Sequence, residues 1–213
     1  MPIPAAQLDA VTVDAFGTLL LLNDPTRPLV AALRNHGLDP DHDAVTAAFR
    51  AEAAYYRPRS VQGRDPESLA ALRRDCVGVF LDSLGADLDA DAFVPAFMAA
   101  IVFRPADGAL AAVDALRAAG LSLACVANWD VSLHEHLDRL ELADRFQLVL
   151  SSAEAGTEKP DPRIFELALA RLQVEPARAL HVGDEEVDRL GAEAAGMAFA
   201  PAPLATLPER LGL

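Results

Sequence analysis

The sequence is poor in cysteine and has no long apolar run. Its two cysteines, Cys76 and Cys125, stand in apolar surroundings, which predicts two buried thiols and argues against a disulfide or a cysteine metal site. This usage fits a reducing, cytoplasmic location. No apolar stretch approaches the roughly 20 residues of a membrane-spanning helix, and the N-terminus does not place an apolar segment after a basic one. We therefore expect neither a membrane span nor a secretory signal.

Positive charge is also scarce. Eighteen lysines and arginines stand against 32 aspartates and glutamates, which gives a formal net charge of −14. Such a charge repels nucleic acid and anionic membrane surfaces, so we expect no nucleic-acid or membrane partner and favour a small-molecule substrate. An anionic substrate would need a local cation, from a lysine or a metal ion. The composition leaves the oligomeric state open.

The chain does contain enough apolar material for a full core. Of its 213 residues, 52% are hydrophobic, which suits one domain with a large insertion or two small domains. Between residues 24 and 103 the pattern predicts only helices, each opened by Asp or Pro. The predicted helices cover residues 25–36, 41–56, 66–84 and 90–101.

Helices and strands alternate in the rest of the chain. Strands are predicted at residues 8–13, 121–127, 146–152, 179–184 and 197–202, and helical segments separate the last four. This alternation implies parallel strands joined by crossover helices. The predicted fold is therefore α/β, with a doubly wound, Rossmann-like parallel sheet and an all-α domain inserted after the first strand. Residues 1–22 and 105–213 would form the core, and residues 23–104 the insertion.

Acidic residues follow the ends of strands in this predicted sheet. Asp14 comes after the first strand, and Asp184 and Asp188 come after the strand "ALHVG". Because the carboxyl ends of parallel strands meet at one edge, we expect these groups to converge, with Lys159 nearby. Converging carboxylates repel each other unless a cation lies between them, and hard oxygen ligands suit Mg²⁺. Taken singly, each acid also fits an ordinary turn or a helix N-terminus.

With these residues in place, the chain resembles the haloacid dehalogenase-like hydrolase superfamily, in the branch with a helical cap between its first two motifs. "VDAFGTLL" resembles the first motif, "VANWD" the second, "EKPDPRIF" the third and "HVGDEEVDRLGAEAAGM" the fourth. The motifs follow the family order with family-like spacing. The resemblance implies a Mg²⁺-dependent phosphatase that acts on a small phosphorylated metabolite through an aspartyl-phosphate.

The resemblance also implies roles for single residues. Asp14 would be the nucleophile, Lys159 would hold Asp14 and the phosphoryl oxygens, and Thr18 would support the turn after the first strand. The backbone N–H of Asn128 would bind the phosphoryl group. The implied Mg²⁺ ligands are Asp14, the backbone carbonyl of Phe16, Asp184 and Asp188.

Two positions depart from the family pattern. Phe16 stands where most phosphatases of the superfamily have a second Asp that moves protons, and Ala127 stands where they have Ser or Thr. General acid–base catalysis is worth about 10²–10⁴-fold, so we expect weak turnover unless another group, such as Asp130, supplies the proton. Two alternatives stay open. One is a phosphate-ester binding or regulatory protein, and the other is a 2-haloacid dehalogenase, whose halide leaves without a proton.

A few candidates lie outside the motifs. The stretch "YYRPRSVQGR" gathers basic and aromatic residues, and within it Arg57 is either a substrate contact or part of a solvated connector. His134 and His136 are expected to be exposed residues of one helix. His181 is expected to be a structural residue of a buried strand.

Overall fold

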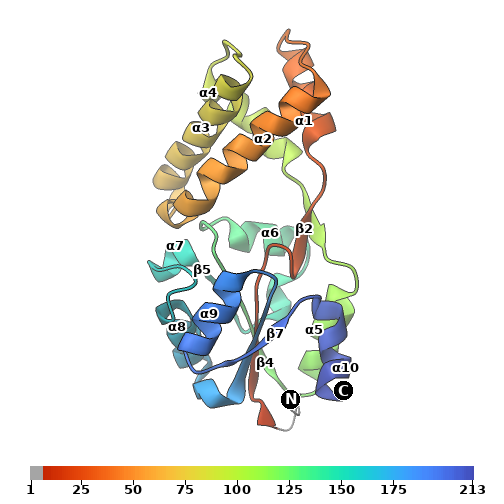
Figure 1. The fold of residues 1–213 in the computed structure, drawn as a ribbon, viewed down its shortest axis with the longest axis vertical. Coiled ribbons are helices and arrows are strands. Elements are labelled where there is room, and N and C mark those ends of the chain that lie inside the picture. The colour runs from red at the N-terminus through yellow and green to blue at the C-terminus, as the bar shows by residue number, and fades with distance from the viewer. Residues whose placement is uncertain (1–6) are drawn as a thin grey trace. The chain divides into compact units, whose positions relative to one another are not determined.

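The computed structural model describes residues 7–213, which fold into two compact units. The helical unit is Leu22–Phe103, and the core unit combines the described residues before it with Arg104–Leu213. In Figure 1 the core unit therefore contains both the red start and the blue end of the chain.

A five-stranded sheet forms the centre of the core unit. Its strand order is β5-β4-β1-β6-β7, and every neighbouring pair runs parallel. The short strand β1 is buried along its whole length, as expected for an apolar strand in a sheet that is covered on both faces. The strands are β1 (Ala10–Val13), β4 (Ser122–Ala127), β5 (Leu148–Ser151), β6 (Ala179–Gly183) and β7 (Ala198–Pro201).

Helices cover both faces of this sheet. Helices α8 and α9 pack against one face, where Ala10, Val126 and Leu150 join one core cluster with Phe165 and Ala192. Helices α5 and α10 lie on the other side (Figure 1). The predicted doubly wound α/β fold is confirmed. The helices are α5 (Ala109–Ala118), α6 (Leu133–Arg139), α7 (Ser152–Ala155), α8 (Arg163–Leu172), α9 (Glu186–Ala194) and α10 (Leu207–Leu211), with short 3-10 turns η3 (Ala143–Arg145), η4 (Pro176–Arg178) and η5 (Leu204–Thr206).

The helical unit contains the four helices that the sequence predicts. They are α1 (Thr26–Asn35), α2 (His42–Tyr56), α3 (Pro66–Ser83) and α4 (Ala90–Ala100), with the 3-10 helix η2 (Arg57–Gln62) after α2. The side chains of Asp41, Asp65 and Asp89 accept backbone N–H groups at the starts of α2, α3 and α4, which stabilises those ends. Phe80 and Phe93 stack inside an apolar cluster. Within residues 7–213, no helix is long and apolar enough to cross a membrane.

Two short strands at the ends of the insertion were not predicted. β2 (Leu20–Leu22) and β3 (Phe103–Pro105) form a separate two-stranded sheet. Just beyond it, the N–H of Asn23 donates to the carbonyl of Val102 over 2.9 Å. Elements of three residues are too short to show a hydrophobic period. The helical insertion therefore begins after β2, and its two ends lie side by side.

The expectation that His136 is exposed is wrong. Its side chain is buried, and its ring packs edge-on against Trp129, with 5.6 Å between the ring centroids. His134, on the same helix, is part-exposed and forms a hydrogen bond with Glu154. Helix α6 is short, and tertiary packing decides which of its side chains are covered. Both cysteines are free and buried, as expected.

Candidate active site

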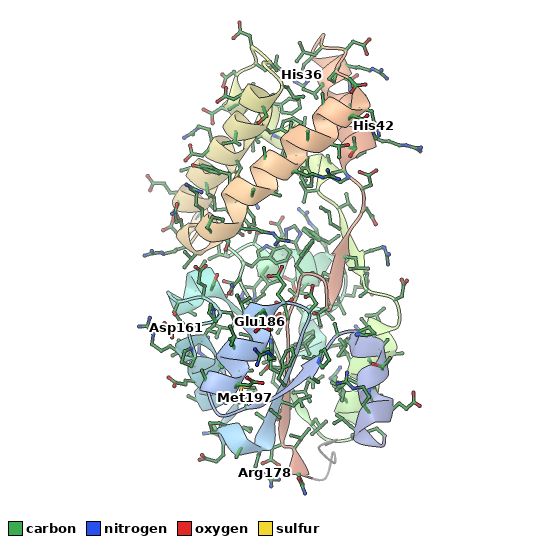
Figure 2. All side chains as sticks on the ribbon, in the orientation of Figure 1. His36, His42, Asp161, Arg178, Glu186 and Met197 are labelled. Carbon is green, nitrogen blue, oxygen red and sulfur yellow. The ribbon has the colours of Figure 1, made fainter. Side chains whose placement is uncertain are left out.

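Three carboxylates converge at the carboxyl end of the sheet. Figure 2 labels Arg178, which precedes β6, and Glu186, which follows it, so the two labels mark the two ends of this strand. On the Glu186 side, Asp14 follows β1, Asp184 follows β6 and Asp188 lies in the first turn of α9. One oxygen from each of these three carboxylates lies within 4.8 Å of the others. The parallel pairing of β1 with β6 brings these chain ends together.

Lys159 links two of the carboxylates. Its ammonium group donates to Asp14 Oδ1 and to Asp188 Oδ1, each over 2.5 Å, and to the carbonyl of Val126 over 3.2 Å. The side chain is almost fully buried. Lys159 is also the only lysine in the sequence. The one side-chain ammonium group of the protein therefore lies in this cluster.

Asn128 holds the segment that carries Lys159. It comes directly after β4, and its side-chain oxygen accepts the Lys159 backbone N–H over 2.8 Å. Its side-chain amide donates to the Lys159 carbonyl over 2.9 Å. The family resemblance implies that the backbone N–H of Asn128 contacts the substrate, and this role stays a prediction. What the structure shows is a side chain that ties β4 to the lysine segment.

Asp184 is held from one side by the turn after β1. Thr18 Oγ1 donates to Asp184 Oδ1 over 3.1 Å. Gly17 has a φ of +86°, and a Cβ built on it would lie 2.2 Å from Asp184 Oδ2, so only glycine fits there. Gly183 is restricted in the same way, because its Cβ would lie 2.5 Å from Asp188 Oδ2. These close approaches fix where both carboxylates lie.

Burial and mutual repulsion set the protonation of the cluster. Burial raises the pKa of Asp14 to about 7 against the attraction of Lys159, and Asp188 and Asp184 add to the rise. Burial also raises the pKa of Asp184. Although burial opposes it, the hydrogen bond with His181 and the charge of Lys159 hold the pKa of Asp188 below its usual range.

The donor set fits a divalent metal ion. With all three carboxylates ionised, one ammonium group would leave two negative charges uncompensated. A divalent cation would balance these charges and favour the ionised form of Asp14, whose pKa is raised to about 7. Carboxylate oxygens are ligands that hard cations prefer. The cluster of Asp14, Asp184 and Asp188 can therefore hold a metal ion.

Two residues beneath the cluster were not predicted to belong to it. His181 is fully buried in β6, with Nε2 3.2 Å from Asp188 Oδ1 and Nδ1 2.8 Å from Thr12 Oγ1. Burial lowers the pKa of His181 to about 4, although the hydrogen bond with Asp188 opposes the shift. The sequence carries a weak signal for this contact, since Thr12 and His181 each precede a strand-end aspartate by two or three residues.

Three other residues named from the sequence are not among the carboxylates and the lysine of the cluster. Phe16 follows Asp14 by two residues, and 41% of its surface is exposed. Asp130 is buried and accepts the N–H of Ser132 over 2.7 Å. Arg57 is an exposed residue of the other unit, at the start of η2. The cluster belongs to the core unit, and a contact between Arg57 and a substrate stays a prediction.

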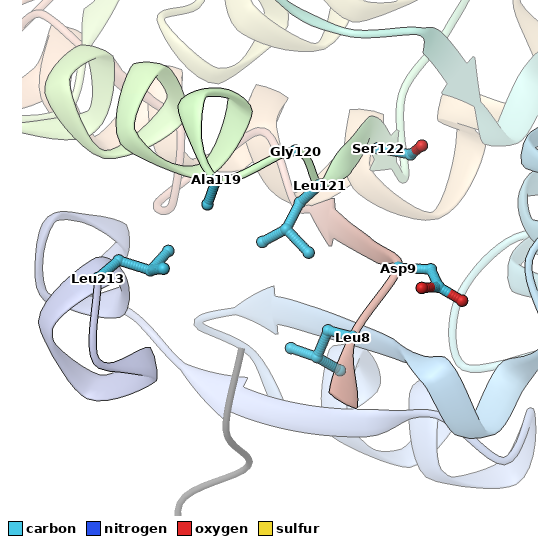
Figure 3. A pocket seen from close by; sticks show the side chains of 7 residues that line it. All are labelled: Leu8, Asp9, Ala119, Gly120, Leu121, Ser122 and Leu213. Carbon is cyan, nitrogen blue, oxygen red and sulfur yellow. The ribbon is translucent and has the colours of Figure 1, made fainter. Parts of the chain in front are cut away.

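A separate pocket lies at the opposite end of the sheet (Figure 3). It has a volume of about 540 Å³ and is lined by Leu8, Asp9, Ala119, Gly120, Leu121, Ser122 and Leu213. Asp9 is the one ionisable side chain among these seven residues, and it pairs with Arg178. The pocket does not bring several ionisable side chains together, so the strand-end cluster is the candidate active site.

Known proteins resemble this chain in sequence and in fold. The sequence profile of the haloacid dehalogenase-like hydrolases matches residues 8–196. A mouse protein called haloacid dehalogenase-like hydrolase domain-containing protein 3 is 33% identical over 90% of this chain and 80% of its own length. The N-acetylmuramic acid 6-phosphate phosphatase of Pseudomonas aeruginosa is 30% identical over 68% of this chain and 67% of its own. The L-2-haloacid dehalogenase of Xanthobacter autotrophicus superposes with a TM-score of 0.67 and 26% identity, covering 92% of this chain and 77% of that one.

Proposed function

Since the chain belongs to the haloacid dehalogenase-like hydrolase family, we propose that it is a Mg²⁺-dependent phosphatase of small phosphorylated molecules. One observation carries the proposal: the carboxylates of Asp14, Asp184 and Asp188 meet at the end of the sheet around a single ammonium group, that of Lys159. The similarity to a sugar phosphate phosphatase supports the same reaction class.

The proposed reaction begins with nucleophilic attack by Asp14. An oxygen of its carboxylate forms a bond to phosphorus while the bond between phosphorus and the leaving oxygen breaks. Lys159 lies 2.5 Å from Asp14 Oδ1, so it can stabilise negative charge on the phosphoryl oxygens. Water then attacks phosphorus and the bond between phosphorus and the Asp14 oxygen breaks, which releases inorganic phosphate and returns Asp14 to its starting form. Over the two steps one proton of this water ends on the leaving oxygen and the other stays with the phosphate.

The metal site would use the oxygens around Asp14. We assign Asp14, Asp184, Asp188 and the backbone carbonyl of Phe16 as its ligands. Mg²⁺, when bound, would neutralise charge that develops on the phosphoryl group. Thr18 would hold Asp184 in place through its hydroxyl.

The helical insertion would serve as a cap domain. In this proposal residues 23–104 limit access of water to the aspartyl ester, while residues 1–22 and 105–213 carry the chemistry. Arg57 would contact an anionic or ring-bearing part of the substrate, and the backbone N–H of Asn128 would bind the phosphoryl group.

Phe16 favours a second candidate, a 2-haloacid dehalogenase. A phenyl ring cannot donate a proton, and halide is a leaving group that needs none. The similarity to the Xanthobacter autotrophicus enzyme adds support. Asp184 favours the phosphatase. A third carboxylate beside Asp14 and Asp188 can serve as a metal ligand, whereas in a metal-free displacement it would only add repulsion.

The deciding experiment gives the purified protein a panel of phosphate esters and 2-haloacids, with and without Mg²⁺. Mg²⁺-dependent phosphate release that disappears in Asp14→Asn supports the phosphatase. Halide release without Mg²⁺ supports the dehalogenase. Thermal protection by Mg²⁺ with beryllofluoride, in the absence of any turnover, would instead indicate a phosphate-ester binding protein.

A second experiment examines Phe16 itself. If no carboxylate at position 16 protonates the leaving group, aryl phosphates should react faster than alkyl phosphates. Phe16→Asp should then raise alkyl phosphate turnover more than aryl turnover, by at most about 10²–10⁴-fold. Steady-state kinetics on matched substrates measures this, with circular dichroism as the folding control. A folded variant without an alkyl-selective gain would indicate that another group already supplies the proton.

A further inference from the structure

A buried line of hydrogen bonds runs beneath the carboxylate cluster. Thr12 and His181 are register partners on β1 and β6, and Thr12 Oγ1 lies 2.8 Å from His181 Nδ1. On the other side of the ring, Nε2 lies 3.2 Å from Asp188 Oδ1. That same oxygen accepts a hydrogen bond from Lys159 Nζ. All four side chains are almost inaccessible to solvent, so the line is shielded from competing water.

The neighbours of the imidazole ring decide which nitrogen carries hydrogen. A neutral ring has one N–H and one acceptor nitrogen, and an ionised Asp188 can only accept. Nε2 must therefore donate to Asp188, and Nδ1 must accept from the Thr12 hydroxyl. The Thr12 carbonyl lies 3.1 Å from Nδ1, so the opposite tautomer would find an acceptor if the hydroxyl were removed. Asp188 thus selects the Nε2–H form, and the Thr12 hydroxyl adds to this preference by donating to Nδ1.

The His181 ring and the Asp188 carboxylate are each restrained by a further contact. Phe165 lies edge-on against the His181 ring, with 4.7 Å between centroids, and this contact opposes ring rotation. The other oxygen of Asp188, Oδ2, accepts the N–H of Glu185 over 3.0 Å. Both oxygens of the carboxylate are therefore fixed.

We propose that His181 is a positioning residue, whose Nε2–H holds Asp188 so that this carboxylate keeps Lys159 directed at Asp14, and that the Thr12 hydroxyl reinforces the required tautomer. An ammonium group whose partners cannot turn away meets developing charge without reorganisation. The effect on kcat rests on the proposed phosphatase function. The tautomer and the placement of Lys159 do not.

Imidazole nitrogen NMR tests the tautomer without any enzyme assay. The His181 signals, among those of five histidines, are assigned by their loss in a His181 variant. We expect the Nε2–H tautomer in the natural chain, a measurable fraction of Nδ1–H in Thr12→Val, and Nε2–H alone again in Thr12→Ser, which keeps the hydroxyl. A natural chain with hydrogen on Nδ1, or a Thr12→Val protein that keeps Nε2–H alone, would overturn the proposal.

A second arm follows Lys159. Because the chain has one lysine, selective lysine labelling gives a single side-chain ammonium signal. His181→Met, which is apolar and of similar length, should shift that signal and lower kcat by about 10–100-fold, with a smaller change in KM. His181→Gln, whose amide can donate from near the Nε2 position, should recover most of the loss.

Thr26→Val is the matched control. It removes another buried threonine hydroxyl, which contacts Thr46 in the helical unit, and it should leave the His181 tautomer, the Lys159 signal and kcat unchanged. A folded His181→Met protein with an unchanged Lys159 signal would refute the positioning role. A different outcome is that the natural protein and all variants fail to hydrolyse phosphate esters while the His181 tautomer and the Lys159 signal behave as expected. In that case the proposed function fails and the positioning role stands.

Discussion

Two buried carboxyl groups, Asp188 in the core unit and Glu52 in the helical unit, have pKa values shifted in opposite directions. In the core unit, Asp188 is surrounded by donors, and Lys159 and His181 hold its pKa below the usual range even though burial opposes this. In the helical unit, Glu52 of α2 is 7% exposed, and burial raises its pKa to about 7 against a hydrogen bond with the Cys76 thiol of α3. Asp188 therefore keeps its charge while buried, whereas Glu52 favours the neutral form.

The two carboxyl groups differ in the partners that surround them. A buried charge costs free energy unless donors and an opposite charge compensate it. For Asp188 the core unit supplies both, through Lys159, His181 and the backbone N–H of Glu185. The helical unit supplies a thiol, which is a weak donor. A buried carboxylate with a full set of partners indicates a built site, whereas a buried acid that gives up its charge makes stability depend on pH.

Removing the shared cation should give the largest effect. Lys159→Met leaves Asp14 and Asp188 buried without their ammonium partner, and breaking a buried pair in this way costs about 3–5 kcal/mol. Urea denaturation near pH 8 measures the loss. Arg178→Met is the control, because the Arg178–Asp9 pair is about half exposed and should contribute far less to stability than a buried pair. Equal losses in the two variants would erase the contrast between buried and exposed pairs.

A divalent cation should stabilise the core unit selectively. Binding to the native state adds about 2.7 kcal/mol at a ligand concentration about 100 times Kd. Mg²⁺ titration calorimetry gives the affinity, and hydrogen exchange shows where protection increases. We expect slower exchange in β1 and β6 and little local change in α2 and α3. Asp184→Asn should weaken both responses, and an unchanged response in that variant would remove Asp184 from the metal site.

Glu52 should make the stability of the helical unit fall as pH rises. The folded pKa lies above the unfolded one, so the stabilised protonated form is present at low pH and is lost as pH rises from about 4.5 to about 7. Glu52→Gln should therefore gain about 2 kcal/mol relative to the natural chain between about pH 5 and pH 8. Denaturant melts at both pH values measure this, with the exposed Glu67→Gln as control. A relative stability that does not change with pH would contradict the raised pKa.

The smallest effect concerns the turn that holds Asp184. Thr18→Val removes the hydroxyl that donates to Asp184 Oδ1, and we expect a loss of about 1 kcal/mol in stability. Mg²⁺ affinity should fall as well, because Asp184 is then free to turn. Thr18→Ser restores the donor and should restore the affinity. If valine and serine bind Mg²⁺ equally well, the hydroxyl does not orient this carboxylate.

Long periodic elements of the fold were predictable, and short ones were not. The helices 41–56 and 66–84 are marked by an apolar period and by Asp or Pro at their starts, and the observed α2 and α3 end within one residue of them. β2 and β3 have three residues each and carry no period. The burial of His136 depends on Trp129, which approaches from outside α6, and no local pattern encodes that contact.

The candidate site was predictable where it follows strand ends. Asp14 and Asp184 come directly after β1 and β6, so the topology alone brings them together. The link between Thr12 and His181 depends on the register of β1 against β6, which an apolar pattern in two short strands cannot fix. The pairing of the Asn128 side chain with the Lys159 backbone depends on the path of a loop. These contacts are set by tertiary geometry.

The adjacent ends of the insertion have a consequence for how such a gene can change. The hydrogen bond from Asn23 to Val102 shows that the chain leaves β2 and re-enters β3 at neighbouring points. A coding segment spanning codons 24–101 is therefore a cassette: its replacement by a longer, shorter or unrelated segment leaves the connectivity of the five-stranded sheet intact. Recombination at these two points exchanges the helical unit without interrupting any strand of the five-stranded sheet.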